Sequence, residues 1–132
     1  MKRLLVATLA AISLMGLLEF LLSMALGSRG GMPSQTGGYL DPLNLLVTAI
    51  AMCLGGYLEG KRFIAVALAI SVVLWIATTF TLVQIAKPVQ AHPLPDILIY
   101  NRVQIVFSLL SACAGAAIGA WLRMKRATTR SA

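Results

Sequence analysis

Long apolar runs separated by short polar stretches dominate the hydrophobic pattern of this chain. The runs cover residues 4–26, 42–58, 63–86 and 97–122. Each suits a membrane-spanning helix, because roughly 20 residues at about 1.5 Å per residue match a hydrocarbon core of about 30 Å. Inside lipid every backbone amide needs a partner within the protein, and a helix provides one along a single run. The pattern predicts an all-α fold, a four-helix transmembrane bundle that forms a single domain over residues 1–132.

The stretches between the runs carry turn and capping residues. Residues 27–41 are rich in Gly, Ser and Thr, and Asp41-Pro42 is typical of an N-cap followed by proline in the first helical turn. Residues 59–62 predict a tight turn between antiparallel neighbours. Residues 87–96 are proline-rich and end in Asp96, which we expect to cap the fourth helix.

The placement of the cations predicts the orientation of the chain. Eight Lys and Arg residues lie on the side of both termini and of the 59–62 turn: Lys2, Arg3, Lys61, Arg62, Arg123, Lys125, Arg126 and Arg130. The other side carries three: Arg29, Lys87 and Arg102. Because Lys and Arg concentrate on the cytoplasmic side, we expect both termini in the cytoplasm (N-in/C-in), outer loops at 27–41 and 87–96, and a cytoplasmic tail at 123–132. The expected location is a bacterial-type inner membrane.

Composition indicates lipid rather than water as the surrounding medium. Hydrophobic residues make up 59% of the chain and charged residues 11%, and a small domain cannot bury that much apolar surface. The net charge of +7 suits anionic lipid head groups, since no basic stripe alternates with aromatic residues as in nucleic-acid-binding proteins. The lipid bilayer is therefore the predicted partner, and nucleic acid is not.

Two features admit alternative interpretations. Lys2-Arg3, an apolar run and Ser23-Met24-Ala25 resemble a secretory signal peptide, but the run is long and contains Glu19, so we expect it to remain as a span. The segment GGYLEGKR at 55–62 returns as GAWLRMKR at 119–126. This repeat indicates either a duplicated hairpin or two similar ends at a membrane interface, and the second alternative is simpler.

Small and polar residues recur at helical spacing along the spans, and such faces are expected to contact protein. The stripes comprise Ser13, Gly16, Glu19, Ser23 and Gly27 in the first span, Asn44, Thr48, Ala51 and Gly55 in the second, Ala77, Thr81 and Gln84 in the third, and Asn101, Gln104, Ser108, Ser111, Gly115 and Gly119 in the fourth. They predict a polar intramembrane cluster of Glu19, Asn44, Gln84, Asn101, Arg102 and Gln104. They also predict close helix packing at Gly16, Gly55, Gly56, Gly115 and Gly119.

Glu19 is the acidic residue that lies inside an apolar run. An ionised carboxylate in lipid costs a few kcal/mol, so Glu19 needs a partner or a proton. In a structural interpretation it is either protonated or paired with Arg102, accepts bonds from Gln104 or Asn101, and fixes how the first and fourth helices dock. In a functional interpretation it exchanges protons or binds a cation in a cavity open to the outside.

The chain resembles small multidrug transporters in its four helices and in the glutamate of the first one. The resemblance ends there, because the chain lacks the aromatic lining of their later helices. Its charge bias also opposes an antiparallel dimer, so we assign no family on this basis.

No residue pattern for catalysis or metal binding stands out. His92 is the sole histidine, and Cys53 and Cys113 lie singly in apolar runs. We therefore predict no enzyme, no metal and no cofactor. The preferred function is contact between helices, as an accessory subunit of other membrane proteins or as a homo-oligomer. The alternative is a small proton- or cation-coupled transporter centred on Glu19, for which an oligomer is expected because four helices enclose little room.

Overall fold

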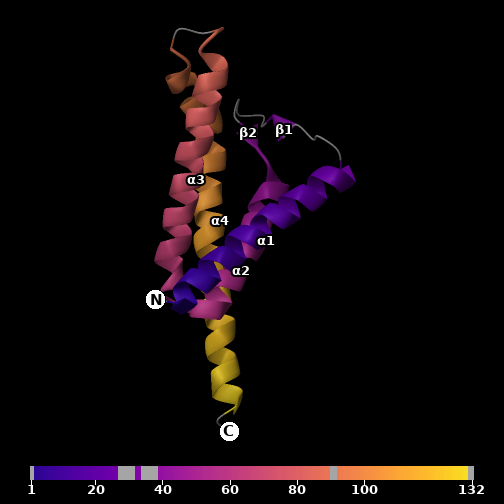
Figure 1. The fold of residues 1–132 in the computed structure, drawn as a ribbon, viewed down its shortest axis with the longest axis vertical. Coiled ribbons are helices and arrows are strands. Elements are labelled where there is room, and N and C mark those ends of the chain that lie inside the picture. The colour runs from indigo at the N-terminus through magenta and orange to yellow at the C-terminus, as the bar shows by residue number, and fades with distance from the viewer. Residues whose placement is uncertain (1, 27–31, 34–38, 90–91, 131–132) are drawn as a thin grey trace.

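The computed structural model contains four long helices and a short β-ladder, and it describes residues 2–26, 32–33, 39–89 and 92–130 (Figure 1). The helices are α1 (Lys2–Leu26), α2 (Pro42–Glu59), α3 (Phe63–Ala86) and α4 (Pro93–Arg130). The strands β1 (Met32–Pro33) and β2 (Tyr39–Leu40) pair antiparallel, with Met32 opposite Leu40. Within the described residues, four helices are long and apolar enough to cross a membrane, which confirms the expected helical architecture.

The predicted boundaries differ from the structure mainly at the two ends of α4. This helix begins at Pro93, so Asp96 lies in its first turn and does not cap it. Prolines fit there, because the first-turn amides they lack have no partner within the helix. The predicted tail at 123–132 is helical as far as residue 130. The predicted loop 27–41 contains the ladder, while 27–31, 34–38, 90–91 and 131–132 lie outside the described residues.

Local chemistry defines both ends of α2. The Asp41 carboxylate accepts hydrogen bonds from the backbone N–H groups of Leu43 at 3.0 Å and Asn44 at 3.2 Å, which confirms the predicted N-cap. At the other end Gly60 has φ 89°, a conformation that glycine adopts without steric cost. Its N–H donates to the carbonyl of Gly56 at 2.7 Å, and the chain turns directly into α3.

α2 and α4 pack against each other along a central seam, formed by the facing residues 49–56 and 111–119. A Cβ placed on Gly56 would lie 2.1 Å from the carbonyl oxygen of Ala116, and one on Gly119 would lie 2.0 Å from that of Cys53. The two backbones are therefore in direct contact, and only glycine permits this approach. The Ser111 hydroxyl adds a hydrogen bond of 2.6 Å to the carbonyl of Leu45.

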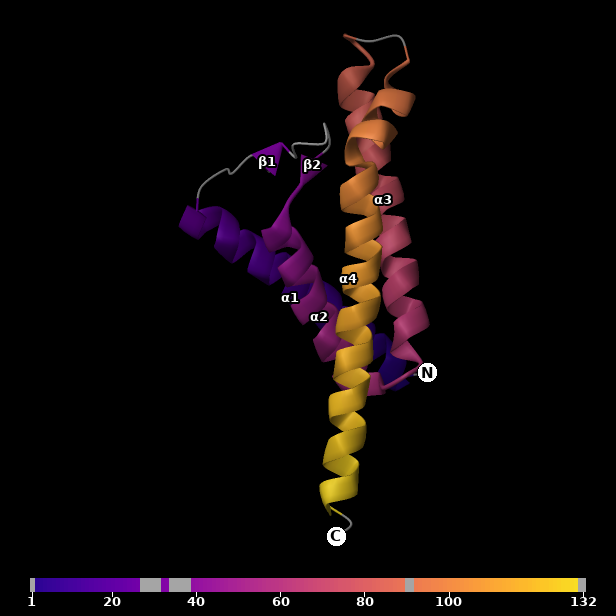
Figure 2. The same ribbon diagram turned by 180° about the vertical axis from the view of Figure 1, so that it is seen from behind.

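The other two helices flank this seam: α1 packs mainly on α2, and α3 on α4. At the lower end in Figure 1, Ala7 and Ala11 of α1 belong to one apolar cluster with Phe63 and Ala67 of α3. Above this cluster α1 diverges from α3 and α4, as both views show (Figures 1 and 2). The bundle is thus closed at one end and splayed at the other.

The lower end also collects basic residues, because α1 and α3 begin there, α2 ends there and α4 extends beyond it (Figure 1). The Arg123 guanidinium donates to the carbonyl of Leu58 at 2.8 Å, and that of Arg126 donates to the Tyr57 hydroxyl. The Lys125 ammonium lies 5.1 Å from the centre of the Trp121 ring. The two arginine contacts hold this part of α4 against the end of α2, whereas the Lys125–Trp121 contact lies within α4.

Candidate functional site

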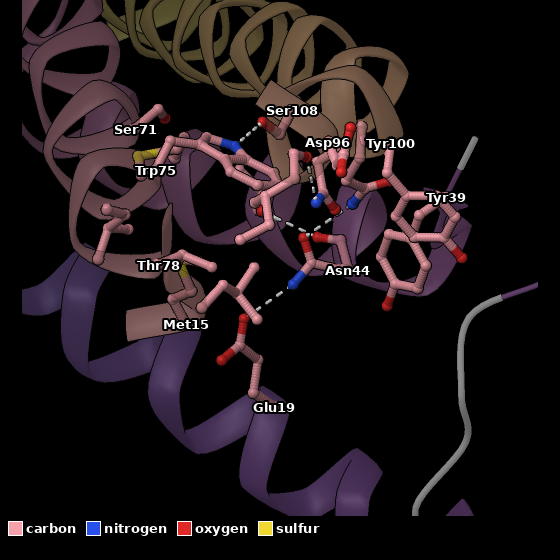
Figure 3. A pocket seen from close by; sticks show the side chains of 17 residues that line it. Met15, Glu19, Tyr39, Asn44, Ser71, Trp75, Thr78, Asp96, Tyr100 and Ser108 are labelled. Atoms are coloured by element: carbon pink, nitrogen blue, oxygen red, sulfur yellow. Dashed lines mark hydrogen bonds between the residues drawn. The ribbon is translucent and has the colours of Figure 1, made fainter. Parts of the chain in front are cut away.

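A cavity of about 870 Å³ lies where α1 diverges from α3 and α4 (Figure 3). We call it the α1–α3 cleft. All four helices and β2 contribute to its walls. Its apolar wall includes Met15, Met52, Leu74 and Leu82. The remaining walls are polar or aromatic, so the cleft combines an apolar interior with several hydrogen-bonding groups.

A chain of hydrogen bonds crosses the cleft from α1 to α4. Asn44 donates from Nδ2 to Glu19 Oε1 at 3.1 Å, and its Oδ1 accepts from Gln104 Nε2 at 3.4 Å (Figure 3). Gln104 Oε1 accepts the backbone N–H of Asp41 at 2.8 Å. Gln104 is buried and Asn44 half-buried, whereas Glu19 is exposed at the mouth. Gln104, at the buried end of this row of hydrogen bonds, positions the Asn44 side chain. Asn44 in turn orients the Glu19 carboxylate.

A second polar contact joins α3 to α4 deeper in the cleft. The Trp75 indole N–H donates to the Ser108 hydroxyl, which itself donates to the carbonyl of Ile105 at 2.9 Å (Figure 3). Both partners line the cleft, so the bond fixes the orientation of the Trp75 ring there. Ser71, one turn before Trp75, also lines the cleft and is only 4% exposed. Its Oγ has no hydrogen-bond partner among the described residues, which leaves a buried polar atom for a bound molecule.

Aromatic and acidic side chains stand at the upper part of the cleft. The rings of Tyr39 in β2 and Tyr100 in α4 lie 6.2 Å apart between centres, tilted by 33°. Asp96 lines the same region (Figure 3). Among the lining residues there are thus two carboxylates, Glu19 and Asp96, and no Lys, Arg or His. These two acidic side chains favour the binding of a cation in the cleft.

The structure brings together four of the six residues expected in a polar cluster: Glu19, Asn44, Asn101 and Gln104 all line the cleft. Asn101 Nδ2 donates to the Ile97 carbonyl of its own helix at 2.8 Å. Gln84 and Arg102 are exposed and lie outside the lining. Arg102 falls on the side of α4 opposite Gln104, and in the described part of the chain no ion pair joins it to Glu19. The Glu19 carboxylate instead accepts a hydrogen bond from the side-chain amide of Asn44.

Of the five glycines expected at close helix contacts, four lie against a neighbouring helix and one does not. Gly55 lies against the Phe63 ring, and Gly56, Gly115 and Gly119 lie against backbone across the seam. Gly16 does not pack, because a Cβ placed there would meet nothing within 4 Å.

Ser13 and Ser23 of the α1 stripe are also exposed, whereas Glu19 of the same stripe lines the cleft. α1 instead buries Ala7 and Ala11, whose small side chains allow it to approach its neighbours closely. In α3 the stripe of Ala77, Thr81 and Gln84 is likewise exposed, because that helix buries the face of Phe63, Ala67 and Ser71.

Several cleft residues escaped the sequence analysis as site residues. Trp75 and Ser71 sit singly in the most apolar run, where a tryptophan is typical of a lipid-facing position and a serine gives no periodic signal. Asp96 is expected from the sequence only as a cap. Tyr39 and Tyr100 reach the cleft through the position of β2 beside α4, which no local pattern encodes.

Within the described residues, no three His, Cys, Asp or Glu side chains come together to hold a metal ion. Cys53 and Cys113 are free thiols in half-buried positions. The chain matches no protein-family model, no curated protein and no solved structure. Its function must therefore be argued from the cleft itself.

Proposed function

We propose that this chain is a small multi-pass membrane protein that binds a cation in the α1–α3 cleft and exchanges it for a proton at Glu19. The observation that carries the proposal is the position of Glu19, at the mouth of a cavity of about 870 Å³ and held by Asn44. The cavity is built by a single chain, so the space expected only of an oligomer is present in one bundle. This favours the transporter alternative over a purely structural role.

The proposed exchange uses groups of this chain alone. A cation that enters the cleft pairs with the Glu19 carboxylate, and the carboxyl proton leaves to the solution. When the cation departs, the carboxylate takes a proton back, so that it is never left charged and unpaired in lipid. Asn44 keeps one oxygen oriented in both states by donating to it.

The proposed orientation places both termini in the cytoplasm of a bacterial-type cell, in its inner membrane. The cations gathered at the end of the bundle where α1 begins and α4 ends support it, since Lys and Arg accumulate on the cytoplasmic side. With this orientation the cleft opens toward the outer half of the bilayer.

The test is proton movement in proteoliposomes that enclose a pH-sensitive dye. Gradients of Na⁺, K⁺ or methylammonium are imposed in turn, and at least one should drive a change of internal pH that Glu19→Gln abolishes. Glu59→Gln is the matched control, because Glu59 lies at the end of α2 and outside the cleft. If neither these three gradients nor one of dodecylammonium moves protons, or if Glu19→Gln moves them as well as the unmodified chain, the exchange proposal is wrong.

A second candidate is the contact function, in which the chain associates with itself or with other membrane proteins. The outward-facing α1 residues Ser13, Gly16 and Ser23 favour it, because small and polar side chains serve helix association in lipid. In that case Gly16→Ile would reduce cross-linking between copies in the membrane, while Glu19→Gln would leave it unchanged. No cross-linking of the unmodified chain, to itself or to another membrane protein, would contradict this candidate.

A further inference from the structure

We propose that the α1–α3 cleft takes an amphiphile with an ammonium head group, and that this amphiphile enters sideways from the bilayer between α1 and α3. The inference rests on the proposed cation exchange at Glu19 and names the class of cation. Four features of the lining carry it: charge, aromatic rings, apolar length and the direction of the opening.

Charge selects the head group. The lining holds the carboxylates of Glu19 and Asp96 and no basic side chain, so an anionic head group would meet acidic groups and no cation to pair with in the lining. Glu19 accepts a hydrogen bond from Asn44 through Oε1, and a carboxylate has acceptor capacity for further donors. An ammonium group provides such donors together with the opposite charge.

Aromatic rings add a second preference for an ammonium group. Trp75, Tyr39 and Tyr100 all line the cleft, and the faces of such rings attract ammonium groups. Because the Trp75 indole is tied to Ser108, its ring is held in place before any ligand arrives. The Ser71 hydroxyl, buried without a partner among the described residues, offers one more polar contact on the same helix.

The size and lining of the cleft argue against a bare metal cation. A hard metal ion needs several oxygen ligands around it, and in the part of the chain that the structure describes no three His, Cys, Asp or Glu side chains come together to supply them. A volume of about 870 Å³ suits a drug-sized organic molecule. Met15, Met52, Leu74 and Leu82 provide apolar contact for its body, and thioether side chains adapt to different shapes.

The geometry of the bundle provides the entrance. α1 and α3 share the apolar cluster at the lower end and diverge above it (Figures 1 and 2), and residues of both helices, among them Met15 and Leu74, line the cleft there. An amphiphile can therefore leave the bilayer with its chain still in apolar surroundings, while its head group meets Glu19 at the mouth.

Binding can be measured on the full chain in phosphatidylcholine nanodiscs through the fluorescence of Trp75. The chain has two tryptophans, and Trp121→Phe leaves Trp75 as the sole reporter. Dodecylammonium should change the emission of Trp75 saturably, whereas dodecanol, with the same chain and no charge, should not. In this background Glu19→Gln should raise the dissociation constant for dodecylammonium about tenfold or more, and Glu59→Gln should leave it unchanged.

The origin of the ammonium group is settled by a second arm, in which phosphatidylethanolamine replaces part of the phosphatidylcholine. If phosphatidylethanolamine competes with dodecylammonium in a way that depends on Glu19, the source is a membrane aminolipid. If it does not compete, the source is a free hydrophobic amine.

Equal changes of Trp75 emission with dodecanol and with dodecylammonium would overturn the inference in favour of a nonspecific apolar groove or a partner helix. This comparison needs no substitution in the cleft. Proton exchange with Na⁺ or K⁺ but no binding of dodecylammonium would overturn the inference alone, while binding without any proton movement would overturn the exchange alone.

Discussion

The α2–α4 seam and the α1–α3 cleft differ both in their residues and in how closely the helices approach each other. In the seam, glycines at 56, 115 and 119 lie directly against the backbone of the facing helix. In the cleft, the helices diverge, and polar side chains line an open space in place of a contact. The seam is therefore closed by the chain itself, whereas the cleft leaves a space that the proposed ligand would occupy.

The stripes of α1 and α4 sharpen the same contrast. Both combine small and polar residues at helical spacing, but that of α4 is buried around Gln104 and Ser108, while that of α1 is exposed around Gly16. A stripe of this kind therefore indicates a face suited to contact with protein, and not whether the same chain provides the contact.

The largest expected effect comes from Gly119→Leu in the seam. A Cβ at this position would lie 2.0 Å from the Cys53 carbonyl oxygen and 2.7 Å from the Tyr57 nitrogen, so α2 and α4 must separate. We expect a loss of about 3 kcal/mol or more in the free energy of unfolding. Unfolding by SDS in mixed micelles, followed by circular dichroism, measures it. Ala117→Leu on the exposed side of α4 is the control, and equal losses for both variants would show that the seam is not closely packed.

The next effect tests the buried end of the cleft. Gln104→Leu removes the acceptor of the Asp41 N–H and the donor to Asn44, leaving polar groups without partners. We expect a loss of about 2 kcal/mol. Gln84→Leu, the same substitution at an exposed position, should change the free energy of unfolding by less than about 0.5 kcal/mol. If Gln84→Leu costs as much as Gln104→Leu, the hydrogen-bond chain does not stabilise the fold.

These two regions also show what could be predicted from the sequence. Apolar length and glycine spacing predicted the helices and the residues of the seam, because both depend on one helix face and one partner. The N-cap at Asp41 followed from local chemistry. The outward direction of the α1 stripe, and the convergence of Trp75, Ser71 and Tyr100, depend on how four helices are tilted relative to one another, and no local pattern records those angles.

A smaller effect is expected at the link between α3 and α4. Trp75→Phe keeps an aromatic ring in the cleft but removes the hydrogen bond to Ser108. A double-mutant cycle with Ser108→Ala should give a coupling of about 0.6–1 kcal/mol in the free energy of unfolding. Trp121→Phe, at an exposed position of α4, should show no coupling to Ser108→Ala. Additive effects of Trp75→Phe and Ser108→Ala would mean that the ring is not fixed by this bond.

The smallest effect is expected on the exposed face of α1. Gly16→Ala adds a Cβ in open space and replaces a glycine inside a helix, so the free energy of unfolding of the isolated chain should rise by about 0.5 kcal/mol. Gly115→Ala makes the same change where the new Cβ would lie 2.3 Å from the Ala49 carbonyl oxygen, and it should be clearly destabilising. Gly16→Ala and Gly115→Ala therefore compare the α1 and α4 stripes through the effect of one added methyl group on the free energy of unfolding. A loss at Gly16 as large as that at Gly115, measured at high dilution in detergent, would show that α1 buries this face within the chain and that the bundle is more closed than its splayed end indicates.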